Sequence, residues 1–343
     1  MTTKPTIAIT MGDPCGIGPE VVAKALAVPQ VWDWCQPLVV GDAGVMQEAL
    51  SLVRSPLRVS RVEAATAEPA GGDTVSVLDP GDLDHGQIRV GHISAEAGRA
   101  SMGWVKLAAE TCISGSTAAM VTAPVNKGAC DLAGYKEIGH MEVLQALTES
   151  PNVATMLLAG ELRVVHLTTH RSLRRACDAV TRENVLAKIT LTHEAFREWR
   201  IPEPRIGVAA LNPHASDGGL LGDEEETQIG PAVEDARRLG IDATGPVPSD
   251  VVFYQAIQGG YDVVLAMYHD QGHVAIKVHD FHGSVAVNLG LPIIRTSVDH
   301  GTAFDIAGRG IANPQSMLEA LRLAVALASG GGLTRLPPLA ASS

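Results

Sequence analysis

The sequence predicts an α/β protein built on a mostly parallel sheet, and three observations lead to this class. Apolar runs of strand length alternate with amphipathic helical stretches along the chain. Polar turns that carry glycine or histidine follow several of these runs. The composition, 46% hydrophobic and 19% charged over 343 residues, is that of a globular protein. Such alternation is typical of parallel strands covered by helices, and the length suffices for one large or two ordinary domains.

The N-terminal part opens with a predicted buried strand at residues 6–10, followed by a glycine-rich turn at 11–18. Pro19 and Glu20 suit the first turn of a helix. A strand, glycine turn and helix can bind phosphate, but the spacing matches neither the dinucleotide fingerprint nor a P-loop. Ligand contact and a simple tight turn therefore both stay open. Further strands are predicted at 38–41, 75–78 and 118–123, and a helix at 95–114.

The segment 261–278 is the strongest candidate for a functional loop. Its apolar run 263–267 predicts a strand, which is followed by a polar loop at 269–273 and a second strand-like run at 274–277. Lys277 lies in this second run, and Arg295 lies in another apolar context. A buried cation needs an anion, which either an acidic side chain or an anionic substrate could supply. Elsewhere, strands are predicted at 164–168, 206–211 and 284–288, and helices at 182–197, from 223 onward and at 316–328.

Three histidines, His170, His214 and His269, follow predicted strands. Because the carboxyl ends of parallel strands meet at one edge of a sheet, these imidazoles could converge. Three protein ligands and one open position make up the usual catalytic divalent-metal site. The nearby carboxylates Asp250 and Asp270 could ligate or orient.

Two further histidines are less favoured as ligands. His166 lies within a predicted strand, where a hydrogen-bonded core histidine is expected. His273 follows His269 by four positions, which would pair the two rings on a helix, but Gly272 between them favours a loop.

The charge and the apolar pattern exclude several classes of protein. The net charge of −12 argues against a nucleic-acid partner. No apolar stretch is long enough to span a membrane, and the N-terminus lacks the features of a signal peptide. The five cysteines are scattered without a C-x-x-C pair, so we expect reduced thiols in a cytoplasmic protein.

Seven segments, in chain order, resemble the 4-hydroxythreonine-4-phosphate dehydrogenase (PdxA) family. They are GDPCGIGPE at 12–20, TAPVNK at 122–127, GH at 139–140, TH at 169–170, NPH at 212–214, YHDQG at 268–272 and LPIIRTSVDHGT at 291–302. The resemblance implies an isocitrate/isopropylmalate dehydrogenase-like fold, in which two α/β domains flank an active-site cleft, and a homodimer with a shared active site. We expect one domain at 1–130 plus 300–335, contributing to the cofactor cleft. A second at 131–299 would carry the metal-site histidines and the dimer interface, and 336–343 would be a frayed tail.

The resemblance also implies roles for single residues. The metal ligands would be His170, His214 and His269, one of them from the neighbouring subunit, with Zn, Mg, Mn and Co not distinguished. The catalytic residues would be Lys277, Asp250 and Asp270, with the general base left open between Lys277 and Asp250. The substrate-binding residues would be His140, Met141, Lys277, Asn288 and Arg295. The residues that bind NAD or NADP would be Gly290, Ser297, Asp299, His300, Gly301 and Thr302.

The implied activity is that of a metal-dependent NAD(P) oxidoreductase that oxidises the secondary alcohol of a phosphorylated hydroxy acid. This acid is either 4-hydroxythreonine 4-phosphate or 4-phospho-D-threonate/erythronate, and loss of CO2 is expected to follow. Met141 and Ala286 depart from the Thr and Asn usual in the family, while His273 and the acidic run 223–225 resemble its catabolic branch. Two alternatives remain: a dehydrogenase of a non-phosphorylated dihydrodiol carboxylate such as the terephthalate dihydrodiol, and a nicotinamide-independent metal lyase or hydrolase.

Overall fold

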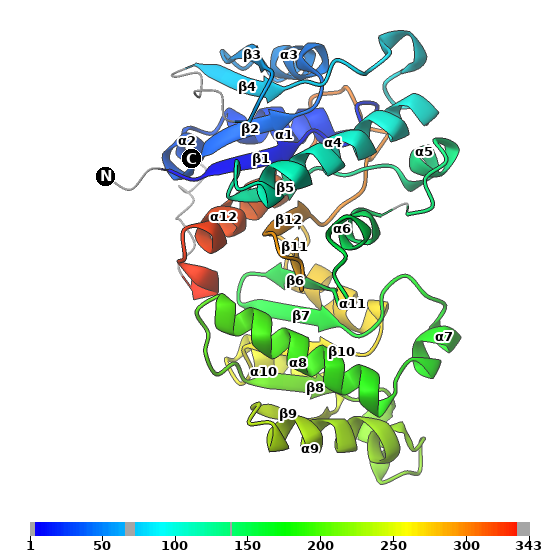
Figure 1. Ribbon diagram of the computed structural model, residues 1–343. Helices are drawn as coiled ribbons and strands as arrows, with labels where there is room; N and C mark the ends of the chain where they lie inside the picture. Colours follow the sequence, from blue (N-terminus) through cyan, green and yellow to red (C-terminus); the bar gives the residue numbers. More distant parts are fainter. Residues whose placement is uncertain (1–3, 66–72, 138, 335–343) are drawn as a thin grey trace. The chain divides into compact units, whose positions relative to one another are not determined.

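Two α/β units make up the chain in the computed structural model, which describes residues 4–65, 73–137 and 139–334 (Figure 1). Unit 1 comprises Met1–Ser150 and Leu291–Ser343, and unit 2 comprises Pro151–Gly290. The predicted α/β class is thereby confirmed. No helix among the described residues is long and apolar enough to span a membrane. The tail expected at 336–343 lies outside the described residues.

The unit boundaries differ from the domain division expected from the sequence. Residues 131–150 fall in unit 1 because α5 (Lys127–Leu132) and α6 (His140–Thr148) pack against α4 (Ala95–Ile113). Residues 291–299 also fall in unit 1, because β12 (Arg295–Val298) pairs with β5 (Ala119–Thr122). Side-chain packing and strand pairing, which the sequence alone does not give, decide both boundaries.

The sheet of unit 1 has the strand order β3-β4-β2-β1-β5-β12, and its pairings are parallel. The strands not yet bounded are β1 (Thr6–Thr10), β2 (Gln36–Val40), β3 (Arg58–Val62) and β4 (Thr74–Leu78). The remaining helices are α1 (Gly18–Leu26), α2 (Pro29–Trp34), α3 (Ala43–Leu52), α12 (Gln315–Ala328), η1 (His85–Gln87) and η4 (Gly332–Thr334). Ile7 and Ile9 of β1 are fully buried, as expected for a strand with paired neighbours on both sides.

Side-chain caps explain where three helices of unit 1 begin. Asp42, Ser94 and Asn126 precede α3, α4 and α5, and each accepts a hydrogen bond from a backbone amide three residues later. Such caps satisfy amides that have no partner inside the helix. The helices that begin at Ala43 and Lys127 start shortly after β2 and β5 end. Their caps therefore also fix how the chain leaves the sheet.

The sheet of unit 2 has the strand order β11-β6-β7-β10-β8-β9. Its strands are β6 (Ala154–Ala159), β7 (Leu162–His166), β8 (Ile206–Ala209), β9 (Ala243–Val247), β10 (Val263–Ala266) and β11 (Val285–Leu289). β6 runs antiparallel to β7 and β11, and the other pairings are parallel. The helices are α7 (Leu173–Asp178), α8 (Arg182–Glu198), α9 (Gly230–Arg238), α10 (Ser249–Ile257), α11 (His269–His279), η2 (Pro213–Asp217) and η3 (Glu225–Ile229).

One prediction for unit 2 is wrong. The residues expected to form a loop at 269–273 and a strand at 274–277 form the single helix α11. Gly272 is required by packing rather than by a loop, because a Cβ there would lie 2.3 Å from His166 Nε2. Ile276, one turn further on, is fully buried in the core beside Val164 and Val264. Packing against β7 therefore favours the helix, and the presence of a glycine in the sequence does not reveal this contact.

Candidate functional site

Three neighbouring strands of unit 2 end just before the histidines predicted to bind metal. β7, β10 and β8 are adjacent and parallel, so their carboxyl ends lie along one edge of the sheet. His170 follows β7, His269 follows β10 and His214 follows β8. This is the edge at which open α/β sheets bind ligands.

His170 and His269 come together at this edge. Their ring centroids are 5.7 Å apart and the rings are tilted by 45°. Two imidazoles that share a tetrahedral metal at ~2.1 Å would have centroids roughly 5 Å apart, so a small adjustment suffices. His269 Nδ1 lies 2.6 Å from Asp270 Oδ1, which leaves Nε2 to face a metal. A carboxylate on the second ring nitrogen is the usual way to orient a metal-binding histidine, so this donor pair fits a divalent ion.

His273 supports the site without joining it as a ligand. Its ring stacks on that of His269, with centroids 3.6 Å apart and planes 14° from parallel. Ligand lone pairs lie in the ring plane, so two stacked rings cannot direct them at one ion. His273 Nδ1 lies 3.1 Å from both the His269 carbonyl oxygen and His166 Nε2. The carbonyl can only accept, so Nδ1 carries the hydrogen and His166 Nε2 accepts as well.

His166 is the buried end of this stack. It is 2% exposed at the end of β7. Burial, followed by the charges of His273 and His269, lowers the pKa of His166 to about 3. The ring is therefore neutral at physiological pH and can serve as an acceptor for His273.

His214 does not complete a three-ligand group with His170 and His269 among the described residues. It is exposed and begins a run of left-handed backbone, in which His214, Ala215, Ser216 and Asp217 all have positive φ values between 49 and 64°. Such a run of non-glycine residues costs free energy and persists only where surrounding contacts fix it. In the described part of the chain, no three His, Cys, Asp or Glu side chains lie close enough together to hold a metal.

The residues predicted to act on the substrate from unit 2 are held by local contacts. Lys277 Nζ donates to Ser284 Oγ at 3.0 Å and lies 5.1 Å from the centroid of the Phe281 ring. Asp250 is exposed in the first turn of α10.

The strand β11 explains the departure from the family pattern at Ala286. Ala286 and Asn288 are two positions apart, so they lie on the same face of the strand. Ala286 packs into the core of unit 2. Asn288 Nδ2 donates to Thr155 Oγ1 at 3.3 Å, so the amide at 288 is engaged in the sheet. Gly290, at φ +81°, ends the unit where a Cβ would lie 2.1 Å from the Asn152 carbonyl oxygen, so its role is steric.

Unit 1 holds a buried cation whose charge acts on a partly buried imidazole. Arg295 is 5% exposed, and its Nε and Nη2 donate to Thr122 Oγ1 at 3.1 and 2.6 Å. Burial lowers the pKa of Arg295 to about 9, against the opposing effect of Glu142. Burial and the charges of Arg295 and Lys127 hold the pKa of His140 well below its usual range. His140 Nε2 is buried and has no hydrogen-bond partner among the described residues. An anion bound here would give His140 Nε2 the partner that it lacks.

Met141 follows His140 in the first turn of α6 and is partly buried. Of the residues predicted to bind the cofactor, Ser297 is buried in β12 and its hydroxyl donates to Thr122 O and Val298 O. The Asp299 amide donates to Ser316 Oγ. His300 Nδ1 lies 3.0 Å from the Gly301 carbonyl oxygen.

The predicted cofactor segment packs against the glycine-rich turn, because β1, β5 and β12 are neighbours. The Ile17 amide donates to Thr302 O at 2.9 Å, and a Cβ on Gly16 would lie 2.8 Å from the same oxygen. Gly301 has open space around its Cα, since a Cβ there would meet nothing within 4 Å. Main chain with little side-chain cover at strand ends fits a nucleotide cofactor.

Asp13 is a buried residue of this turn whose importance sequence reasoning missed. Its Oδ1 accepts the Cys15 amide at 2.8 Å, and burial raises its pKa to about 6. An Asp between Gly and Pro is the signal that could have identified this turn-forming side chain. Burial, then the charge of Asp13, raises the pKa of the Cys15 thiol to about 11, so this cysteine is inert.

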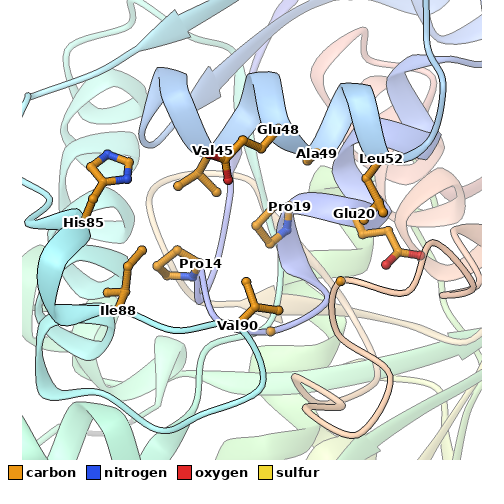
Figure 2. Close-up of a pocket in the computed structure, with 12 residues that line it drawn as sticks. Pro14, Pro19, Glu20, Val45, Glu48, Ala49, Leu52, His85, Ile88 and Val90 are labelled. Carbon is orange, nitrogen blue, oxygen red and sulfur yellow. The ribbon is translucent and has the colours of Figure 1, made fainter.

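A cavity of about 260 Å³ opens on the other side of the glycine-rich turn, beside α3 (Figure 2). Pro14, Val45 and Val90 line it, so its walls are largely apolar. Glu20 lies at one end but pairs with Lys24 at 3.0 Å. None of the residues predicted from the sequence to act on substrate, metal or cofactor lines this cavity.

Comparison with known proteins places the chain among similar sequences over nearly its full length. A family model described as pyridoxal phosphate biosynthetic protein PdxA matches residues 33–324. A Symbiobacterium thermophilum protein assigned as a D-threonate 4-phosphate dehydrogenase is 42% identical over 335 residues, which are 98% of this chain and 100% of the relative.

Two crystal structures are also similar. A 4-hydroxythreonine-4-phosphate dehydrogenase from Klebsiella pneumoniae matches with a TM-score of 0.86 and 40% identity, over 95% of this chain and 100% of that one. A terephthalate 1,2-cis-dihydrodiol dehydrogenase from Burkholderia xenovorans matches with a TM-score of 0.64 and 30% identity, over 94% and 98%.

Proposed function

The chain belongs to the PdxA family, and from that premise we propose that it is a divalent-metal-dependent NAD(P) dehydrogenase of a phosphorylated hydroxy acid. The expected assignment to oxidoreductases acting on CH–OH groups is confirmed by its dehydrogenase relatives, which also imply a nicotinamide cofactor. The proposed substrates are 4-hydroxythreonine 4-phosphate and 4-phospho-D-threonate or -erythronate.

The observation that carries the phosphorylated substrate is the pair Arg295 and His140. The Nε2 atom of His140 is buried without a hydrogen-bond partner among the described residues, and a bound anion would supply one beside a guanidinium charge that acts on this ring. With a pKa of about 9, Arg295 is still charged at neutral pH. Guanidinium is well suited to phosphate, which it can contact through two parallel hydrogen bonds.

The metal would be held by His170, His269 and His214, one of them supplied by a second subunit. When bound, the metal lowers the pKa of the substrate hydroxyl and the nicotinamide accepts the hydride. Asp270 orients His269, while Arg295 and His140 bind the phosphate. Asp250, an exposed carboxylate, is our first candidate to accept the hydroxyl proton. Lys277, held by Ser284, would stabilise the enolate that forms when the β-keto acid loses CO2.

A homodimer is proposed because unit 2 exposes a group of apolar side chains. Tyr254 of α10 is 66% exposed, and Val274, Val278 and Phe281 in and after α11 are 59, 82 and 66% exposed. Exposed apolar groups of this kind mark interfaces. We expect the wild type to elute as a dimer in light-scattering chromatography and Val278→Glu to shift it to monomer. Exposed Leu239 of α9, changed to Glu, is the control and should leave the dimer intact.

The activity is tested by NADH and NADPH formation with a substrate panel, before and after metal removal by chelation. The panel holds 4-hydroxythreonine 4-phosphate, 4-phospho-D-threonate, 4-phospho-D-erythronate and the terephthalate dihydrodiol. We expect a phosphorylated acid to be oxidised only with metal. Arg295→Gln should raise its KM by roughly 10- to 100-fold, since a charged hydrogen bond contributes about 1.5–3 kcal/mol. Oxidation of the phosphorylated acid without metal contradicts the proposal.

A second candidate, the dihydrodiol dehydrogenase, is favoured by Ala286, which leaves no amide at a position where the family has Asn. Turnover of the diol alone would select it. A nicotinamide-independent lyase or hydrolase is distinguished by thermal unfolding, because NADH would then not raise the melting temperature.

A further inference from the structure

Side chains connect the three strand exits that precede His170, His214 and His269. The connections run between segments far apart in the sequence, all within unit 2. None of these side chains was identified as functional from the sequence.

Gln271 connects the exits of β10 and β8. Its Oε1 accepts the Met267 amide at 2.6 Å, just after β10. Its Nε2 donates to the Ala210 carbonyl oxygen at 2.7 Å, just after β8, and to Ser249 Oγ at 2.8 Å. The Ser249 hydroxyl in turn donates to Ala210 O at 2.8 Å. The acceptor and both donors of the Gln271 amide are therefore engaged, with main-chain groups and the Ser249 hydroxyl as partners.

Glu225 fixes the next two residues after Ala210. It is 4% exposed, and its Oε1 accepts the amides of Leu211 and Asn212 at 2.8 and 2.7 Å. Its Oε2 accepts Asn212 Nδ2 at 2.8 Å. A π-helical turn delivers this carboxylate to the loop that carries His214. Bonds of this kind can hold the left-handed backbone that begins at His214.

Thr168 extends the connection to β7. Its hydroxyl is 7% exposed and donates to the Met267 carbonyl oxygen at 2.9 Å. The Met267 amide therefore donates to Gln271, and the Met267 carbonyl oxygen accepts from Thr168. His170 lies two positions after Thr168 and His269 two positions after Met267.

We infer that Thr168, Gln271 and Glu225 are positioning residues that set the placement of the three histidine loops within each subunit, and thereby the metal affinity of the sites that two subunits would share. This inference rests on the proposed function. A metal site needs its ligands held within about 0.5 Å of the productive geometry by supporting side chains. Loss of such support typically lowers metal affinity by ~10- to 100-fold. The geometry assigns Gln271 the central place, since it contacts two of the three exits directly.

The first experiment compares wild type, Gln271→Leu and Thr168→Val with the control Gln258→Leu, an exposed glutamine at the end of α10. Amide hydrogen exchange is measured on the metal-free protein. We expect Gln271→Leu to speed exchange at Leu211 and Asn212, some 60 positions away in sequence, and at Met267. The control should leave these amides unchanged. Unchanged exchange at Leu211 and Asn212 in Gln271→Leu overturns the inference.

The second experiment titrates the same proteins with Co²⁺ and records the visible absorption of the bound ion, which reports ligand geometry. We expect Gln271→Leu to bind Co²⁺ ~10- to 100-fold more weakly with an altered band, and Thr168→Val to show a smaller change in the same direction. Wild-type affinity and spectrum in both variants overturn the inference. If Gln271→Leu does not fold, Thr168→Val alone decides. Failure of the wild type to bind Co²⁺ is a separate result, which overturns the proposed metal dependence itself.

Discussion

The connection from β1 to α1 and the connection from β10 to α11 reach the same kind of sheet edge by different means. In unit 1 the connection is held by main chain: the amides of Met11, Asp13 and Ile17 donate to carbonyl oxygens of segments distant in the sequence. In unit 2 it is held by side chains, since the Met267 amide and carbonyl bind Gln271 and Thr168.

The difference predicts which kind of substitution destabilises each connection. A main-chain connection depends on close approach, so an added Cβ is more damaging than a lost functional group. A side-chain connection depends instead on its donors and acceptors. The first suits a cofactor bound through backbone, and the second suits metal ligands that must be held in one orientation.

The largest effect is expected for Gly12→Ala in unit 1. Gly12 has φ +74°, and a Cβ would lie 2.5 Å from the Pro124 carbonyl oxygen. The left-handed backbone and the overpacking should together lower the free energy of unfolding by about 4 kcal/mol. Gly115→Ala is the control, with the same φ of +74° but nothing within 4 Å of its Cβ, and should cost about 1 kcal/mol. Equal losses in urea unfolding would show that close approach does not decide stability here.

Asp13→Asn tests a side chain that stabilises the main-chain turn. The folded-state pKa of Asp13, about 6, lies above its ordinary value of 3.8. The protonated form therefore stabilises the fold fully below pH 3.8, and this contribution is lost as pH rises through about 6. Asn cannot ionise and keeps the acceptor for Cys15. Relative to wild type, the free energy of unfolding of Asp13→Asn should rise by about 2 kcal/mol between pH 4.5 and pH 8, which melting curves at the two pH values would show. A pH-independent difference would contradict a buried, raised carboxyl pKa.

In unit 2, Asp270→Asn is expected to weaken the free energy of metal binding by about 2 kcal/mol. Loss of the carboxylate beside His269 Nδ1 should lower divalent-metal affinity by ~10- to 100-fold, while the melting temperature of the metal-free protein hardly changes. Asp280→Asn, at the other end of α11, is the control for calorimetric titration. Equal metal affinity in both variants would mean that Asp270 does not orient His269.

The sequence predicted the bounds of those helices and strands whose apolar periodicity and capping residues agree. β1 lies at Thr6–Thr10 as predicted, and α4 at Ala95–Ile113 lies within one residue of the predicted helix. α11 was missed because Gly272 serves a contact with His166 of β7, a residue more than 100 positions earlier. The strand β6 went unrecognised although Pro151 and Gly160 flank it, and with it the antiparallel part of unit 2.

For the candidate site, the strand-end rule correctly indicated that His170 and His269 approach each other. It could not indicate the left-handed turn that begins at His214, since Ala215 and Ser216 carry no signal for positive φ. The predicted ligand roles themselves stay predictions. Residues such as Gln271 and Glu225 act on main chain, and no spacing along the sequence reports that.

The helix α11 carries both His269 and Lys277 on one continuous segment. They are eight positions apart, so at 1.5 Å per residue their Cα atoms are displaced by ~12 Å along the axis. In the proposed enzyme, a relative that acts on a longer or shorter acid could not move the lysine independently of the metal ligand. A change in substrate length would have to be absorbed by segments other than α11. Diversification of substrates within such an enzyme would therefore accumulate outside α11, which would keep its length.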